Sequence, residues 1–231
     1  MDITWKTLCM GIMGAAGMVL TGCAGSLRGE SGVVRPGRGA PGVIAVVPFF
    51  VTRPETEARR LVRCPRCEEY VVAGEVLQEA PGMLTSLFRQ RLTALGHNLI
   101  PQERVANAFP VWRDLEEQPE VLAQRLAHEV RADSVLVGWI LRYEERVGNA
   151  WGVQRPASVA FAAFLWSARD GGLLWRGHFD ETQKPLSENV LDVFSFLRRG
   201  GRWLTASQLV SDGISRALLT FPAGEGVMVN R

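Results

Sequence analysis

Residues 158–166 predict a β-strand that is apolar on both of its faces. Successive side chains of a strand point to opposite sides of a sheet, and here both alternating sets are apolar. One set is Val159, Phe161, Ala163 and Leu165, and the other is Ala160, Ala162, Phe164 and Trp166. Such a strand is typical of the centre of a sheet that is buried on both sides, and it constrains the fold more than any other segment.

Four further segments predict strands from their β-branched, aromatic or alternating composition, namely residues 43–51, 97–100, 134–141 and 173–179. The run at 43–51 is continuous, which is typical of a strand buried on both faces. Pro48 marks its end, because proline cannot donate a hydrogen bond to a central ladder.

A tight turn at Asp170-Gly171-Gly172 predicts that the last strand forms a hairpin with the central one, since glycine readily adopts the positive φ of such turns. Strict alternation along 173–179 then places three large apolar residues on one face. They are Leu173, Trp175 and Phe179.

Apolar residues at helical spacing predict helices at 83–95, 102–109, from 119 onward and at 206–221. Gly96 ends the first helix, and Pro119 begins the third. Thr205 and Gln208, three residues apart, form a capping box at the start of the last helix.

The predicted order is β-α-β-α-α-β-β-β-α, an α/β (α+β) fold in which helices pack against a mixed sheet. We expect a single domain over residues 42–223, with an insertion at about 52–80 and a tail at 224–231. The insertion holds a short strand or hairpin around Tyr70-Val71-Val72. The hydrophobic fraction of 47% and the charged fraction of 22% are those of a packed globular protein. A formal net charge of +2 gives no indication of nucleic acid as a partner.

The N-terminus resembles that of bacterial lipoproteins. Leu20-Thr21-Gly22-Cys23 follows an apolar run at 8–20, and Lys6 supplies a positive charge before it. The run is shorter than the roughly 20 apolar residues needed to cross a bilayer, so a cleaved signal peptide over residues 1–22 is expected rather than a membrane span. The resemblance implies a lipid on Cys23.

The segment at 23–41 is rich in Gly, Pro, Arg and Ser and shows no periodicity, which predicts a flexible tether. Ala24 after the lipidated cysteine implies sorting to the outer membrane in the enterobacterial pattern. The domain would then be anchored by its lipid and face the periplasm, because several acyl chains anchor a protein stably.

Four motifs in a fixed order resemble one superfamily of envelope domains, namely residues 43–49, 100–104, 132–138 and 167–175. This superfamily includes the curli secretion lipoprotein, the lipoprotein activator of penicillin-binding proteins and the N-terminal domain of the Tol–Pal translocation protein. The resemblance covers about residues 42–221 and implies an anticodon-binding-domain-like fold. The insertion and the loop at 194–203 depart from the superfamily pattern.

Cys64-Pro65-Arg66-Cys67 is the one motif with an evident chemistry. Glu68 follows where haem attachment requires histidine, which excludes that role. A structural disulfide, a metal site and a redox dithiol remain open. A zinc site would need ligands from His97, His128 or His178, which lie on separate elements.

Large apolar residues and arginines gather in the loop before the last helix, where they predict either a partner-binding surface or a cap over the sheet. The candidate partner-binding residues are Phe194, Phe196, Arg198, Arg199, Arg202 and Trp203.

A polar set on the last strand offers a weaker candidate site, and the outward face of a half-buried strand explains it better. The set is Arg176, His178, Asp180 and Glu181.

The chain has no G-x-S-x-G elbow, P-loop or H-E-x-x-H motif, so we expect no catalysis and no cofactor. The leading hypothesis is a lipid-anchored periplasmic adaptor or assembly lipoprotein that binds an envelope protein. One alternative is an oligomeric secretion-channel subunit like the curli lipoprotein. The other is a thiol-redox or metal-binding protein that uses Cys64 and Cys67.

Overall fold

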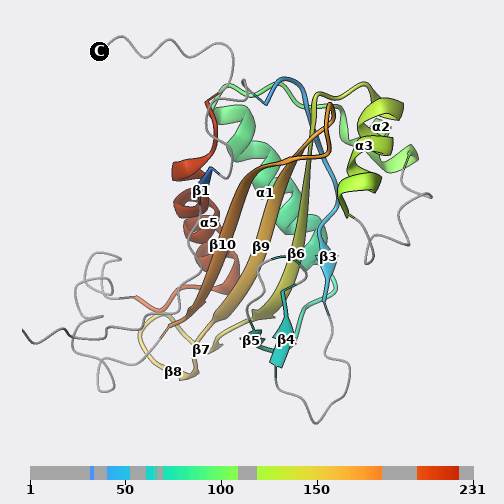
Figure 1. The fold of residues 1–231 in the computed structure, drawn as a ribbon. Helices are drawn as coiled ribbons and strands as arrows, with labels where there is room; N and C mark the ends of the chain where they lie inside the picture. The colour runs from blue at the N-terminus through green and yellow to red at the C-terminus, as the bar shows by residue number, and fades with distance from the viewer. Residues whose placement is uncertain are drawn as a thin grey trace, which may run out of the picture.

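A computed structural model describes residues 32–33, 41–52, 61–64, 66, 70–108, 119–183 and 202–223. At its centre lies a mixed sheet with the strand order β1-β10-β9-β6-β2, and β3 also pairs with β6 (Figure 1). The sheet strands are β1 (Gly32–Val33), β2 (Ile44–Val46), β3 (Phe50–Val51), β6 (Ser134–Glu144), β9 (Ser158–Ser167) and β10 (Leu173–Thr182). β2 and β3 run parallel to β6, and the other pairs are antiparallel.

Two small hairpins and four α-helices complete the described fold. The hairpins are β4 (Leu61–Arg63) with β5 (Tyr70–Val72), and β7 (Val147–Gly148) with β8 (Val153–Arg155). The helices are α1 (Ala80–Ala94), α2 (Gln102–Asn107), α3 (Pro119–Val130) and α5 (Ala206–Ala217), which a 3-10 turn η3 (Leu218–Thr220) follows. The α/β class, with helices packed against a mixed sheet, is confirmed.

β9 lies between β6 and β10, as its two apolar faces predicted. Its side chains divide between two hydrophobic clusters, and the division is the predicted one. Val159, Phe161, Ala163 and Leu165 join the first cluster, and Ala160, Ala162, Phe164 and Trp166 join the second. Both faces of the sheet are therefore core.

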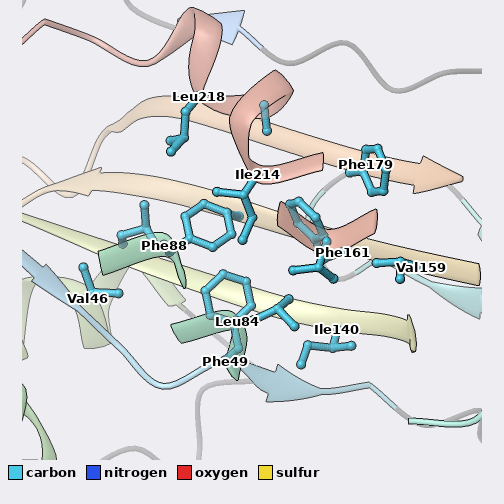
Figure 2. Packing of buried hydrophobic residues seen from close by; sticks show 14 of the residues in the cluster. Val46, Phe49, Leu84, Phe88, Ile140, Val159, Phe161, Phe179, Ile214 and Leu218 are labelled. Atoms are coloured by element: carbon cyan, nitrogen blue, oxygen red, sulfur yellow. The ribbon is translucent and has the colours of Figure 1, made fainter. Parts of the chain in front are cut away.

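The first cluster lies on the helix face of the sheet, which α1 and α5 cover (Figure 1). Phe88 of α1 stacks on Phe49 at 4.9 Å between ring centroids and meets Phe161 of β9 edge-on at 5.6 Å (Figure 2). Gly138 of β6 admits the Phe49 ring, because a Cβ atom there would lie 2.1 Å from it. These aromatic contacts thus pack α1 against the centre of the sheet.

The second cluster lies on the opposite face, which we call the hairpin face. α2 and α3 cover one part of it, and the β4–β5 hairpin packs there through Val62, Cys64 and Val71. The buried Leu122, Leu126 and Val130 form the predicted inward stripe of α3.

Several predicted boundaries are wrong, each for a structural reason. The 43–51 strand is interrupted after Val46 and resumes at Phe50, since Pro48 cannot continue the ladder. Residues 97–100 form a single bridge from Leu99 to Ile44 rather than a strand. Leu95 follows the last helical residue of α1 and is exposed, so it leaves the predicted apolar stripe.

Two further differences concern β10 and the predicted tether. A bulge between Leu173 and Trp175 breaks the predicted alternation, so Leu173 packs with the second cluster while Trp175 and Phe179 pack with the first. Within the segment expected to be a tether, Gly32–Val33 forms β1 and pairs with β10. Composition had given no indication of this pairing.

Candidate functional site

Cys64 and Arg66 of the cysteine motif lie between β4 and β5. Cys64 is fully buried and disulfide-bonded. Cys67 lies outside the described residues, so its pairing with Cys64 stays a prediction. Among the described residues, no group of three or more His, Cys, Asp or Glu side chains is placed to hold a metal ion.

Arg66 connects this turn to the rest of the domain. Its guanidinium forms an ion pair with Glu120 at the start of α3 and lies 5.6 Å from the ring centroid of Trp166. Burial acts to raise the pKa of Glu120, but the hydrogen bond and positive charge of Arg66 leave that pKa below its ordinary value. The turn is thus attached to both α3 and β9.

Arg142 attaches β5 of the same hairpin to the sheet. Its side chain donates to the backbone oxygen of Val72 at 2.7 Å, to Ser158 at 2.6 Å, and forms an ion pair with Asp180. Arg142 is only 5% exposed. A buried guanidinium requires such partners, because its desolvation would otherwise be very costly.

The β4–β5 hairpin presents an apolar surface to solvent. Val62 and Val71 point inward and are buried, whereas their neighbours point to solvent. Leu61 is 50% exposed, Tyr70 65% and Val72 55%. We define the hairpin outer face as Leu61, Arg63, Tyr70 and Val72, which pair across the two strands. Exposed apolar groups that are contiguous in this way are typical of binding surfaces.

A second exposed aromatic site lies in the β6–β9 connection, residues 145–157. Trp151, between β7 and β8, is 72% exposed, and the Arg202 guanidinium lies 5.1 Å from its ring centroid. Trp203 donates its backbone N–H to the oxygen of Ala150 at 2.9 Å. The structure thus brings two of the predicted partner-binding residues, Arg202 and Trp203, against this connection.

The polar set predicted on β10 does not form one site. Asp180 pairs with Arg142 on the hairpin face, while Glu181 pairs with Arg216 of α5. Arg176 is exposed, and His178 is half-buried. Adjacent strand residues point to opposite faces, which separates the two carboxylates.

The remaining candidates, Cys23, Phe194, Phe196, Arg198 and Arg199, lie outside the described residues. Sequence reasoning missed two residues of the candidate sites. Nothing in the sequence showed that Arg142 would be buried, but the glycines around Trp151 are a turn pattern that could have indicated an exposed aromatic residue.

Within the described part of the chain, no helix has the length and apolar character needed to cross a membrane.

No protein-family model and no curated protein matches the chain. The structure is similar to the PelC dodecamer from Paraburkholderia phytofirmans, with 16% identity over 81% of this chain and 92% of that chain and a TM-score of 0.45. It is also similar to lipoprotein GNA1162 from Neisseria meningitidis, with 18% identity over 70% and 99% of the two chains and a TM-score of 0.40. The LpoB C-terminal domain from Escherichia coli shares 15% identity over 64% and 88%, with a TM-score of 0.41. Since all three TM-scores are below 0.5, these similarities carry no argument about function.

Proposed function

We propose that this chain is a lipid-anchored, non-catalytic binding protein of the bacterial envelope. Leu20-Thr21-Gly22-Cys23 after a short apolar run supports a lipid on Cys23 and a location at the outer membrane, facing the periplasm. The domain would bind a protein partner, and the hairpin outer face is the surface that we assign to it.

The observation that most supports this assignment is that the apolar side chains of the hairpin outer face are exposed to solvent. Tyr70, Leu61 and Val72 are each at least half exposed, while Arg142 and Arg66 attach the hairpin to the rest of the fold. Interface cores are enriched in tyrosine and apolar residues and are bordered by polar ones, of which Arg63 is an example.

The described ion pairs that join two elements have an evident structural role. Arg66 with Glu120, Arg142 with Asp180 and Arg216 with Glu181 each join two elements of the fold. The complete burial of Cys64 disfavours the thiol-redox alternative, because reactive cysteines are partly exposed. The channel-subunit alternative would be decided by the size of the full-length protein in detergent.

A photo-reactive benzoylphenylalanine at position 70 tests the assigned surface in intact cells. We expect a discrete crosslinked product from this position, since a bound partner would lie against the Tyr70 side chain. The matched control carries the same group at Leu219, which is 82% exposed but lies after α5, far along the chain from the hairpin.

A Leu61→Asp change should abolish the position-70 crosslink, because a carboxylate opposite Val72 would interrupt the apolar face. A Leu219→Asp change should leave it intact. A product of equal yield from positions 70 and 219, or none from position 70, would refute the assignment.

A further inference from the structure

We infer that the β6–β9 connection faces the membrane and that Trp151 and Arg202 contact the headgroup region of a bilayer containing anionic phospholipid. This inference rests on the proposed lipid anchor at Cys23. It adds an orientation of the domain and a second, non-covalent membrane contact.

The register of β1 gives the direction of this strand along β10. Gly32 pairs with Arg176 and Val33 with Trp175, so lower residue numbers in β1 lie toward higher ones in β10. The N-terminal side of β1 therefore faces the end of β10 at Thr182.

The β6–β9 connection lies at this same end. Ser158, the first residue of β9, pairs with Glu144 at the end of β6 and with Thr182 at the end of β10. Figure 1 shows β7 and β8 beyond these strand ends. The six residue-to-residue steps from Arg176 to Thr182 span about 20 Å at roughly 3.4 Å per residue. The nine or so residues from Cys23 to Gly32 reach at most about 30 Å, which is enough to place the lipid at the level of the connection.

The tryptophan is held outward by an ordered turn. The Asn149 side chain accepts hydrogen bonds from the backbone N–H groups of Trp151 at 2.9 Å and Gly152 at 3.0 Å. The backbone of Trp203 closes the turn from the other side through Ala150. A turn whose backbone is ordered in this way loses little further conformational freedom when its side chain enters an interface.

The charges around Trp151 complement an anionic surface. Residues 146–155 and 202–203 contain Arg146, Arg155 and Arg202 and no carboxylate, while the Glu145 carboxylate before them accepts hydrogen bonds from the backbone N–H groups of Arg146 and Ala206. Arg155 and Arg202 are exposed, and Val147 beside Arg155 adds exposed apolar surface. Tryptophan is enriched at the headgroup level of membranes, and each arginine near an anionic surface contributes about 1 kcal/mol.

The opposite end of the sheet offers a control position. The β9–β10 turn lies there, between Ser167 and Leu173. Leu219 also lies at this end, because its neighbour Thr220 accepts a hydrogen bond from the indole of Trp175 near the start of β10. Leu219 is even more exposed than Trp151 and provides a matched control position.

Tryptophan quenching in vesicles tests the orientation. The full-length lipidated protein is reconstituted into vesicles of phosphatidylcholine with phosphatidylglycerol, in which the upper acyl chains are brominated. Quenching is compared between the wild type and Trp151→Phe. We expect Trp151→Phe to lose most of the bilayer-dependent quenching, and Arg202→Gln to lose the part that depends on phosphatidylglycerol.

A Leu219→Trp change in the Trp151→Phe background should add emission that bromine does not quench. Equal quenching in the wild type and Trp151→Phe would overturn the inference and would favour a protein contact at Trp151. Quenching of the tryptophan at position 219 would reverse the orientation. Flotation with the vesicles separates the two hypotheses, because protein that does not float refutes the anchor itself, and the inference falls with it.

Discussion

At the scale of single residues, His97 is a histidine whose burial disfavours its charged form. Its ring is 7% exposed and meets Phe221 edge-on at 5.0 Å, between the end of α1 and the end of η3. Its Nδ1 atom is buried and has no hydrogen-bond partner within the described residues. Burial therefore lowers the pKa of His97 below its ordinary value.

The free energy of unfolding should consequently fall as the pH falls below about 6.5, the ordinary value for histidine. Below that value the unfolded chain binds a proton at His97 that the folded chain binds less readily, so protonation favours unfolding. The stability contribution is complete above about pH 6.5 and is lost as the pH falls toward the lowered pKa. Urea unfolding between about pH 7.5 and 5.5 measures the slope.

A His97→Gln change should flatten this slope, whatever it does to stability at neutral pH. Identical slopes for the wild type and His97→Gln would contradict the prediction.

At the scale of elements, a bulge in β6 creates the attachment of the β4–β5 hairpin. The register shifts between Ile140 and Arg142. Leu141 and Arg142 therefore both lie on the hairpin face, and Tyr143 packs in the helix-face core. Without that shift, strict alternation would direct Arg142 into the apolar cluster. Burial in that core, with the charges of Glu145 and Glu79, raises the pKa of Tyr143 to about 12.

An Arg142→Met change should loosen the hairpin and lower the free energy of unfolding by about 2 kcal/mol, the scale for a lost hydrogen bond to a charged group. The loss should stay below that of a fully buried ion pair, because Asp180 is partly exposed and can be hydrated. Urea unfolding measures the stability, and limited proteolysis within residues 61–72 reports release of the hairpin.

The exposed Arg169 provides the comparison for that change. Arg169→Met should unfold at the same urea concentration as the wild type and resist protease equally. Equal behaviour of Arg142→Met and Arg169→Met would show that Arg142 does not hold the hairpin.

The same elements show how much the sequence can predict. The two faces of β9, the Thr205–Gln208 capping box of α5 and the positive φ of Gly96 were all predictable, because each depends on residues close together in sequence. The bulges in β6 and β10 were not, since a bulge depends on the pairing of distant strands. The buried place of Arg142 follows from such a bulge, and so it was missed.

At the scale of the whole molecule, the proposed membrane contact and the proposed partner surface lie at the same end of β6. β1 attaches the N-terminal chain to the edge of β10, so only about nine residues, rather than the whole predicted tether, separate Cys23 from the folded domain. The expected mean reach of such a segment is roughly 15–18 Å. The β6–β9 connection would then lie near the bilayer, and a partner on the hairpin outer face would be bound close to it, because Arg142 near the end of β6 holds Val72 of the hairpin (Figure 1).

The central claim is that a lipid on Cys23 anchors this domain, and mass spectrometry of the N-terminal peptide from membrane-purified protein tests it most directly. We expect the chain to begin at Cys23, with the mass of acyl chains on this residue, and a Cys23→Ser variant to lose both the cleavage and the added mass. A protein that retains residues 1–22 and carries an unmodified Cys23 thiol would contradict the account.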